Sequence, residues 1–418
     1  MMIIHILISL FLICDGTSQT VSAEVELFID SLHMFVQTSN RGYSFLLFAI
    51  NTEAEYTYLE NYAFKDKAGE STQSVKTIVF DLNSTEFKGI EYKDKIKIAQ
   101  AESYFNYTII DDFHFIVLDD NELIFVSSSL SFALRPKDET YSLVHLLKKQ
   151  NVINKKQFSL YSNRTGIKGQ IFFGDVNHTF IETNNYVFTT ELKVKGDKNV
   201  WDVQFSHIFI GDIKNKNYLS NSNGAYISTT TKYIQVPLND FEFIVEKYVQ
   251  KLLDDKDCAI DPYGRHSISC QCEAKDKMGN ITLIIQGHKY VFNGGDLLYK
   301  STELCTFGII VNEKSYDWIL GVTFLWKYYT AFDYENSKIV IYSQEPLEEY
   351  KVKNVILINC MMYIANTFIC IGLIVLGIYL IMNRKKDMNY NYYKEIFTNI
   401  KSVVLQIQDS PPISGFSV

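Results

Sequence analysis

The chain contains 418 residues, of which 47% are hydrophobic and 14% aromatic, and its formal net charge is -8 at pH 7. A chain of this length can bury a sizeable core, and its aromatic content with only 6 Pro favours folded β structure over disorder. An acidic chain without a basic stripe excludes nucleic acid as the expected partner.

Residues 1–23 have the pattern of a secretory signal peptide. An apolar stretch runs from Met1 to Cys14 and is too short to cross a bilayer, and Val21, Ser22 and Ala23 form a small-residue cleavage site. The signal peptide directs the rest of the chain into the secretory route. We therefore expect the residues that follow to lie outside the cell or in a lumen.

The next part of the chain, up to residue 350, has the apolar patterns of strands with few helices. The clearest strand patterns lie at residues 43–50, 108–118, 170–174 and 201–210. Helical spacing is found at 143–147 and again at 241–252, where it follows Pro237 and an Asn-Asp pair suited to capping. These patterns predict an all-β fold with short helices.

One acidic cluster could in principle bind a metal ion, because oxygen-rich loops suit hard cations. Its members are Asp111, Asp112, His114, Asp119 and Asp120. The simpler interpretation is that they are solvated turn residues at the two ends of a strand. We therefore expect no metal site and no cofactor.

Four cysteines lie between the signal peptide and residue 350. They are Cys258, Cys270, Cys272 and Cys305. In an oxidising compartment they predict two disulfides, with three connectivities possible from the spacing alone. A zinc site is the alternative, but the cysteines lack the paired spacing and the His-x-His pattern of such sites.

Five Asn-x-Ser/Thr motifs agree with a secretory route, because this motif is the acceptor for N-glycosylation. The motifs begin at Asn83, Asn106, Asn163, Asn177 and Asn280. Together they predict a glycoprotein.

A second apolar stretch, residues 355–382, is long enough to cross about 30 Å of hydrocarbon. The basic cluster Arg384, Lys385 and Lys386 follows it directly. Basic residues mark the cytoplasmic side of a span, so the pattern predicts a transmembrane helix at 355–382 and a cytoplasmic tail at 383–418. The chain is expected to be a single-pass type I membrane protein.

Several segments resemble the pepsin-like aspartic proteases of peptidase family A1. The strongest is "DWILGVTFLWKYYTAFDYENSKIVIYS" at 317–343, which resembles the closing segment of that family. "QFSLYSN" with "GQIFFGDV" resembles the strands between the two lobes, and "VWDVQFSHIFIG" resembles the first strand of the second lobe. "GYSFLLFAINTEAEYTYLENYAF" and "FDLNSTEF" are similar to the first half of the family, and the likeness covers about residues 40–345.

The resemblance implies a bilobal pepsin-like fold with a peptide-binding cleft between two β lobes. The lobes are expected at residues 24–185 and 186–350. The resemblance also implies a second-lobe disulfide that joins Cys305 to either Cys270 or Cys272.

In this family each lobe contributes an Asp-Thr/Ser-Gly turn, and in the second lobe a proline follows nine residues after the aspartate. Counting back from Pro237 places this turn at Ser228, Thr229 and Thr230. Distance from the first strands places its partner at Asn61, Tyr62 and Ala63, and the flap above both turns at Tyr92. By this alignment both catalytic aspartates are absent.

Two carboxylates that share a proton carry out acid proteolysis, and neither an amide nor an alcohol can replace them. The resemblance and the lost aspartates therefore predict an inactive, monomeric relative that binds a peptide or protein between its lobes. Two alternatives stay open. The chain could be an active endopeptidase with a non-standard site, or a structural surface glycoprotein.

Overall fold

The protein is described here from a computed structural model. It covers residues 20–28, 31–38, 45–52, 57–60, 70–80, 85–100, 103–118, 130–134, 142–162, 168–195, 201–211, 217–220, 222, 224–261, 267–300, 303–313, 316–350, 371–376 and 394–402. The chain divides into two units, Met1–Tyr350 and Lys351–Val418.

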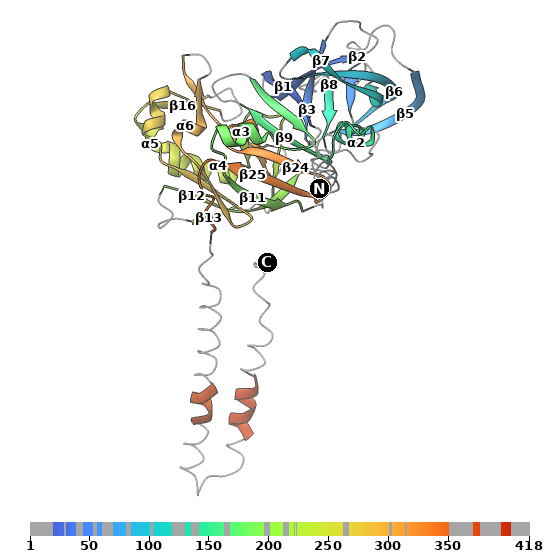
Figure 1. Ribbon diagram of the computed structural model, residues 1–418. Coiled ribbons are helices and arrows are strands. Elements are labelled where there is room, and N and C mark those ends of the chain that lie inside the picture. Colours follow the sequence, from blue (N-terminus) through green and yellow to red (C-terminus); the bar gives the residue numbers. More distant parts are fainter. Residues whose placement is uncertain are drawn as a thin grey trace, which may run out of the picture. The chain divides into compact units, whose positions relative to one another are not determined.

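The first unit is mainly β, as the alternating apolar patterns predict (Figure 1). Among the described residues its largest sheet has 13 strands. In spatial order they are β11 (Phe188–Lys193), β25 (Lys338–Ser343), β24 (Tyr329–Asp333), β9 (Gln157–Ser162), β10 (Lys168–Phe173), β1 (Val21–Phe28), β2 (Ser31–Thr38), β3 (Phe45–Asn51), β8 (Leu130–Ala133), β4 (Tyr58–Glu60), β7 (Ser103–Leu118), β6 (Thr85–Gln100) and β5 (Glu70–Phe80).

The middle of this sheet joins the two halves of the unit. β1, β10 and β9 come from the first half, whereas β24, β25 and β11 come from the second. β9 and β24 pair antiparallel with Phe158 opposite Phe332, and the two rings stack with centroids 4.4 Å apart. Trp201 packs edge-on against Phe332, so the aromatic residues of both halves share one core.

A short helix, α2 (Leu143–Lys149), packs on the first half as its apolar spacing predicts. The Ser142 side chain caps it by accepting a hydrogen bond from His145 N. At its other end the Gln150 amide bonds both backbone groups of Asp111 on β7. The helix is thereby fixed to the edge of the sheet.

The second half contains two further sheets. The larger consists of β19 (His288–Phe292), β18 (Ile281–Ile285), β12 (Asp202–Ile210), β14 (Gly224–Ile227), β23 (Trp318–Leu320), β15 (Ile234–Val236) and β22 (Ile309–Val311), with β13 (Asn217–Leu219) beside β12. The smaller consists of β16 (Cys258–Ile260), β17 (Ile268–Cys270), β21 (Cys305–Phe307) and β20 (Leu298–Lys300). Besides α2, the helices that the structure describes in the first unit are α3 (His178–Thr183), α4 (Leu238–Ile244), η5 (Val245–Val249), α5 (Gln250–Asp254), η6 (Cys272–Asp276), α6 (Gly294–Leu297) and α7 (Val322–Leu325).

The helical face predicted at 241–252 is found in α4, η5 and α5, which follow one another without a break and include one π turn. The predicted cap differs, because no side chain caps this helix. Asp240 is instead completely buried, and its Oδ2 accepts hydrogen bonds from Ser220 Oγ and Trp318 Nε1. Asp240 therefore attaches the helix to β23.

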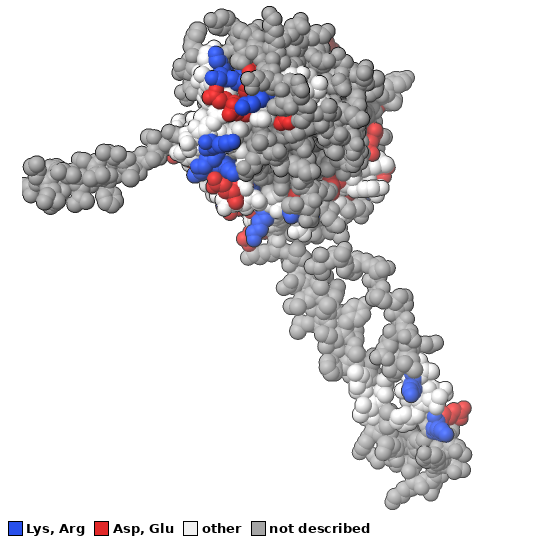
Figure 2. Space-filling view, turned by 90° about the vertical axis from the view of Figure 1, so that its right-hand side faces the viewer, with Lys and Arg blue, Asp and Glu red and all other residues white. Residues whose placement is uncertain are grey.

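Basic and acidic side chains lie interspersed on the face of the molecule shown in Figure 2. Surface ion pairs join neighbouring elements, such as Lys338 of β25 with Glu191 of β11 and Lys277 with Asp257.

The second unit is described only at residues 371–376 and 394–402, which are helical. Most of the predicted span at 355–382 and most of the tail lie outside the described residues. Within the described part of the chain, no helix has the length and apolar character needed to cross a membrane.

Candidate functional site

A turn rich in hydroxyl groups, Ser228 to Thr230, follows β14 at the junction of the two halves. Ser228 and Thr229 are completely buried. Ser228 N donates to Leu320 O at 3.0 Å, which attaches the turn to β23. Ser228 Oγ accepts a hydrogen bond from Thr230 N at 3.2 Å and lies 3.0 Å from Thr230 Oγ1. This hydroxyl is therefore engaged within its own turn, as is usual for small polar side chains.

Thr229 meets a threonine from the other half of the molecule, Thr52, which follows β3. Thr52 Oγ1 donates to Ile227 O at 2.9 Å, and Thr229 Oγ1 donates to Ile50 O in return. Each hydroxyl also accepts the other residue's backbone N–H at 3.3 Å. Both side chains are completely buried, so these bonds stabilise the junction far from solvent.

The two turns are related by an approximate twofold symmetry. Ile50, Asn51 and Thr52 on one side correspond in position and bonding to Ile227, Ser228 and Thr229 on the other. A parallel strand supports each turn: β8 lies beside β3, and β23 lies beside β14. Asn51 and Ser228 therefore occupy equivalent positions, immediately before the paired threonines.

The structure brings Ser228, Thr229 and Thr230 to the junction, where sequence reasoning had placed them. The predicted partner turn, Asn61 to Ala63, lies outside the described residues. The described turn that meets Thr229 is at residues 50–52, about ten positions earlier in the chain. A signal for it exists in the sequence: "AINT" at 49–52 resembles "YIST" at 226–229.

Gly321 packs directly against the segment that follows the Ser228 turn. A Cβ on this residue would lie 2.2 Å from Tyr233 O and 2.5 Å from Thr231 O. Val322 N donates to Thr231 O, and Thr323 donates to Lys232 O through both its N and its Oγ1. A glycine is needed here because two backbones approach too closely for any side chain.

Tyr92, the predicted flap residue, lies in the paired interior of β6 and not at a hairpin tip. It is opposite Phe115 on β7 and Ser71 on β5, and its ring stacks on Phe115 with centroids 6.1 Å apart. Residues 81–84, which connect β5 to β6 in the chain, lie outside the described residues. Tyr92 is therefore a residue of a paired strand and not the tip of a flap.

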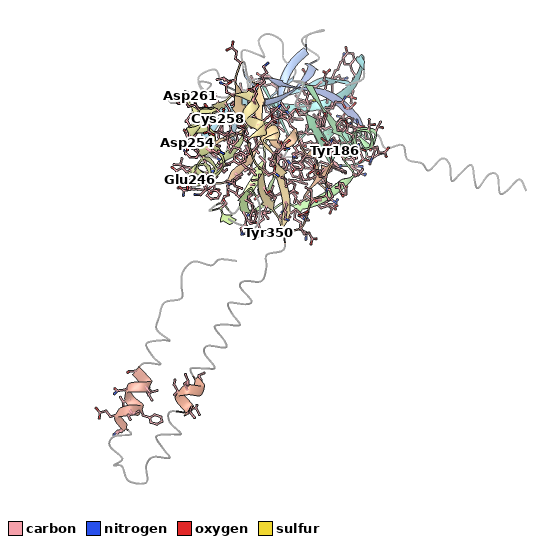
Figure 3. All side chains as sticks on the ribbon, turned by 90° about the vertical axis from the view of Figure 1, so that its left-hand side faces the viewer. Tyr186, Glu246, Asp254, Cys258, Asp261 and Tyr350 are labelled. Carbon is pink, nitrogen blue, oxygen red and sulfur yellow. A yellow bond between two sulfur atoms is a disulfide. The ribbon has the colours of Figure 1, made fainter. Side chains whose placement is uncertain are left out.

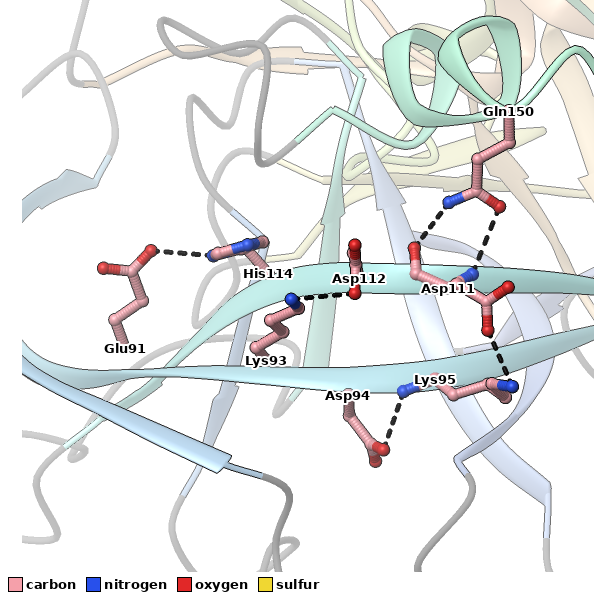
Figure 4. Close-up of polar contacts among 8 residues, drawn as sticks. All are labelled: Glu91, Lys93, Asp94, Lys95, Asp111, Asp112, His114 and Gln150. Carbon is pink, nitrogen blue, oxygen red and sulfur yellow. Dashed lines mark hydrogen bonds and ion pairs between the residues drawn. The ribbon is translucent and has the colours of Figure 1, made fainter.

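Asp111 and Asp112 lie within β7 and not in turns at the ends of a strand, as the simpler interpretation expected, and each forms an ion pair with a lysine of β6. Figure 4 shows Lys93 beside Asp112 at 2.8 Å and Lys95 beside Asp111 at 2.7 Å. The Lys93 ammonium lowers the pKa of the exposed Asp112 carboxyl. Among the described residues no cluster of His, Cys, Asp and Glu has the composition of a metal site. Asp119 and Asp120 lie outside the described residues.

A register shift explains why Asp111 and Asp112 both face solvent. Asp94 pairs with Phe113 and Ile96 with Ile110, so β7 carries one extra residue in this stretch. Asp112 has φ 54°, as the bulged residue. Below it, His114 Nδ1 lies 3.0 Å from Glu91 Oε1 (Figure 4).

Both predicted disulfides are present, and the structure decides their pairing. Cys258 joins Cys270 across β16 and β17, and Cys272 joins Cys305. The first fixes a hairpin at the edge of the second half, where Cys258 and Asp261 are labelled in Figure 3. Cys272, and not Cys270, is therefore the partner of Cys305.

Two of the predicted glycosylation motifs have side chains that can be described. The Asn177 side chain caps α3 by accepting a hydrogen bond from Phe180 N, and Asn280 is exposed in the turn before β18. Asn106 lies in β7, and Asn83 and Asn163 lie outside the described residues.

Comparison with solved structures supports the architecture described above. The crystal structure of aspartic proteinase from Irpex lacteus matches with a TM-score of 0.59 and 14% sequence identity, covering 78% of this chain and 97% of that chain. At this identity the likeness shows the fold alone.

Among curated proteins, gastricsin from Homo sapiens is 23% identical over 219 residues, which are 50% of this chain and 52% of that protein. Mucorpepsin from Rhizomucor pusillus is 24% identical over 212 residues, covering 48% of this chain and 47% of its own length. The chain thus spans about half the length of the curated relatives it matches.

A family model described as eukaryotic aspartyl protease matches residues 86–343, which is more than half of the chain. The match contains β23, which supports the Ser228 turn, together with Gly321 and the closing strands β24 and β25. The chain therefore belongs to the eukaryotic aspartyl protease family.

Proposed function

We propose that this protein is a catalytically silent pepsin-like protease that binds an extended peptide or a protein segment between its two halves. One observation carries the proposal: the residues before the paired threonines are Asn51 and Ser228, an amide and an alcohol. In this proposal Asn51, and not the predicted Asn61, is the first-half residue at the position of a catalytic aspartate.

Acid proteolysis by this family needs two carboxylates that share a proton, so that one activates water while the other protonates the substrate. An asparagine amide neither takes nor gives a proton near neutral pH. The Ser228 hydroxyl is a far weaker acid than a carboxyl group and a far weaker base than a carboxylate, so it cannot take the role of either. The two turns can therefore form hydrogen bonds to a neutral group but cannot carry out general acid and base catalysis.

Loss of the acids leaves the supporting framework in place. The reciprocal bonds of Thr52 and Thr229 still hold the two halves together. An extended peptide bound between β lobes gains affinity from main-chain hydrogen bonds and selectivity from side-chain pockets, neither of which requires a carboxylate dyad.

An active aspartic endopeptidase is the second candidate, because the threonine pair and the Gly321 turn are intact. A proteolysis assay separates the two. Full-length protein is incubated at acidic pH with casein and with fluorogenic peptides, with and without a statine-type inhibitor, and gastricsin serves as the positive control. We expect no hydrolysis above background. Cleavage that the inhibitor blocks would overturn the proposal.

A structural surface glycoprotein is the third candidate, and peptide binding distinguishes it. A peptide library is tested for saturable binding to the wild type and to Thr230→Trp, which adds bulk beside the paired turns. Leu238→Trp is the control, because Leu238 is 48% exposed on a helix start. Binding that is lost only in Thr230→Trp supports a ligand between the halves, and no saturable binding supports a structural role.

We further propose that the protein is a single-pass type I membrane glycoprotein of the secretory route. The support is the apolar stretch at 355–382 with its basic flank, together with the two disulfides, which persist in oxidising compartments.

A further inference from the structure

The last residues of the first unit return to the second half and bind one of its hairpins. Lys289 N donates to Glu348 O at 3.0 Å, and Tyr350 N donates to Gly287 O at 2.6 Å. Between them Glu349 forms an antiparallel bridge with His288. Residues 348–350 thus add a short strand to β19, and we call this contact the C-terminal clasp. Tyr350 lies at the edge of the body in Figure 3.

His207 lies beneath the clasp. It is opposite Ile284 on β18, which is opposite Lys289 on β19, so the three side chains share one face of the sheet. The Tyr350 ring covers His207, with centroids 5.4 Å apart, and also packs on Phe209 at 5.2 Å. Closure of the clasp therefore depends on contact with an imidazole.

The surroundings of His207 favour its neutral form. Its Nδ1 is buried and has no hydrogen-bond partner among the described residues, and burial lowers the pKa of the imidazole below 6.5. From β19 and the clasp, the groups on this face are Lys289, Glu348 and Tyr350. Lys289 and Glu348 already pair with each other at 2.6 Å. Among the described residues, an imidazolium here would be desolvated without a carboxylate of its own.

We infer that the C-terminal clasp is a pH-sensitive latch that is closed at neutral pH and opens when His207 is protonated. At neutral pH, residues 348–350 would then stay paired with β19. In an acidic compartment they would be released from it. The described residues of the latch, His207, Lys289 and Tyr350, lie in the second half and are not those of the Thr52–Thr229 junction.

The sign of the effect follows from the direction of the shift. Because the folded pKa of His207 is lowered, its contribution to closure is complete above about pH 6.5 and is lost as the pH falls below that value. Lys289 lowers the pKa of Glu348, so that carboxylate stays ionised in this range. The Lys289–Glu348 pair is therefore not the source of the change.

Hydrogen exchange measured on the full-length chain at about pH 7.5 and pH 5 tests this inference, with rates corrected for intrinsic exchange. We expect the amides of Lys289 and Tyr350 to exchange faster at the lower pH, by up to about tenfold for each pH unit between 6.5 and the lowered pKa. His207→Phe keeps the ring contact with Tyr350 and removes the charge. It should keep these amides protected at both pH values.

His288→Phe is the matched control, because His288 lies at the clasp but on the opposite face of the sheet. This variant should keep the wild-type response. Tyr350→Ala should raise exchange at both pH values and thereby show that the probe amides report on the clasp. A wild type without a pH response, or a response that survives in His207→Phe, would overturn the inference.

Discussion

At the scale of single residues, two threonines define the junction of the molecule. Thr52 and Thr229 are separated by 177 positions in the chain, yet each satisfies buried backbone groups of the other's turn. A threonine hydroxyl suits this role because it donates one hydrogen bond and accepts others at the same time. Each turn thus depends on the opposite half for its hydrogen bonds.

Thr229→Val removes the hydroxyl and keeps the shape of the side chain. It leaves the buried Ile50 O and Thr52 N without their partner, so we expect a loss of about 2–4 kcal/mol in the free energy of unfolding. Chemical denaturation of the full-length protein measures this loss. Thr330→Val is the control, because the buried Thr330 hydroxyl donates to Tyr328 O, two residues earlier in the chain. Equal losses for both variants would contradict a special role for bonds between the halves.

At the scale of elements, the predicted signal-peptide cleavage site lies within strand β1. Val21, Ser22 and Ala23 pair with β10, and Val21 and Ala23 are buried. Cleavage after Ala23 would remove these three residues from the strand. The boundary predicted from small residues at 21–23 thus falls inside an element of the folded sheet.

We expect the mature chain to begin at or before Val21. Mass spectrometry of the N-terminal peptide, from protein that has passed through the secretory route, identifies the first residue. A chain that starts at Glu24 should be less stable than one that starts at Thr20 by about 2–4 kcal/mol, since it loses the buried Val21 and Ala23 side chains and their ladder bonds. A natural N-terminus at Glu24 with full stability would refute this expectation.

The two disulfides close loops of different length. Cys258 and Cys270 are 12 positions apart across one hairpin, whereas Cys272 and Cys305 are 33 positions apart and join η6 to β21. In the chain-entropy account a longer closed loop restricts the unfolded chain more.

Removal of the Cys272–Cys305 pair by double serine substitution should cost about 4 kcal/mol of stability, and removal of the Cys258–Cys270 pair about 3 kcal/mol. Denaturant titration under non-reducing conditions compares the two variants. Peptide mapping of the wild type should recover both of these linkages. A larger cost for the shorter loop would contradict the loop-closure explanation.

At the scale of the whole molecule, the halves are joined by a sheet and by the paired turns, and the C-terminal clasp ends the body at Tyr350. The predicted anchor begins immediately after this body. Its sequence pattern is strong because about 20 apolar residues suffice to span a bilayer and a basic cluster ends the stretch.

Full-length protein should stay with membranes after an alkaline carbonate wash, whereas a chain ending at Tyr350 should be released into the medium. A chain that lacks only residues 383–418 should remain membrane-bound, which separates the span from the tail. Recovery of the full-length chain in the carbonate supernatant would rule out the anchor.

Most of the fold could be predicted from local patterns. The alternation at 43–50, 108–118, 170–174 and 201–210 predicted strands that the structure contains, and the spacing at 143–147 predicted α2. The segment that contains Trp318 and Gly321 predicted the family. These signals are readable because strand period, helix period and tight turns depend on residues near one another in the chain.

The amino-acid sequence by itself therefore determined the fold class, the family and the second-half turn at Ser228. Only the tertiary structure decided that residues 50–52 meet that turn, that Tyr92 lies within a paired strand, that Cys272 is the partner of Cys305, and that Tyr350 covers His207. The physical reason is shared by all four. Each feature depends on which segments, distant in the chain, become neighbours in the folded protein. Local sequence patterns contain no information about those pairings.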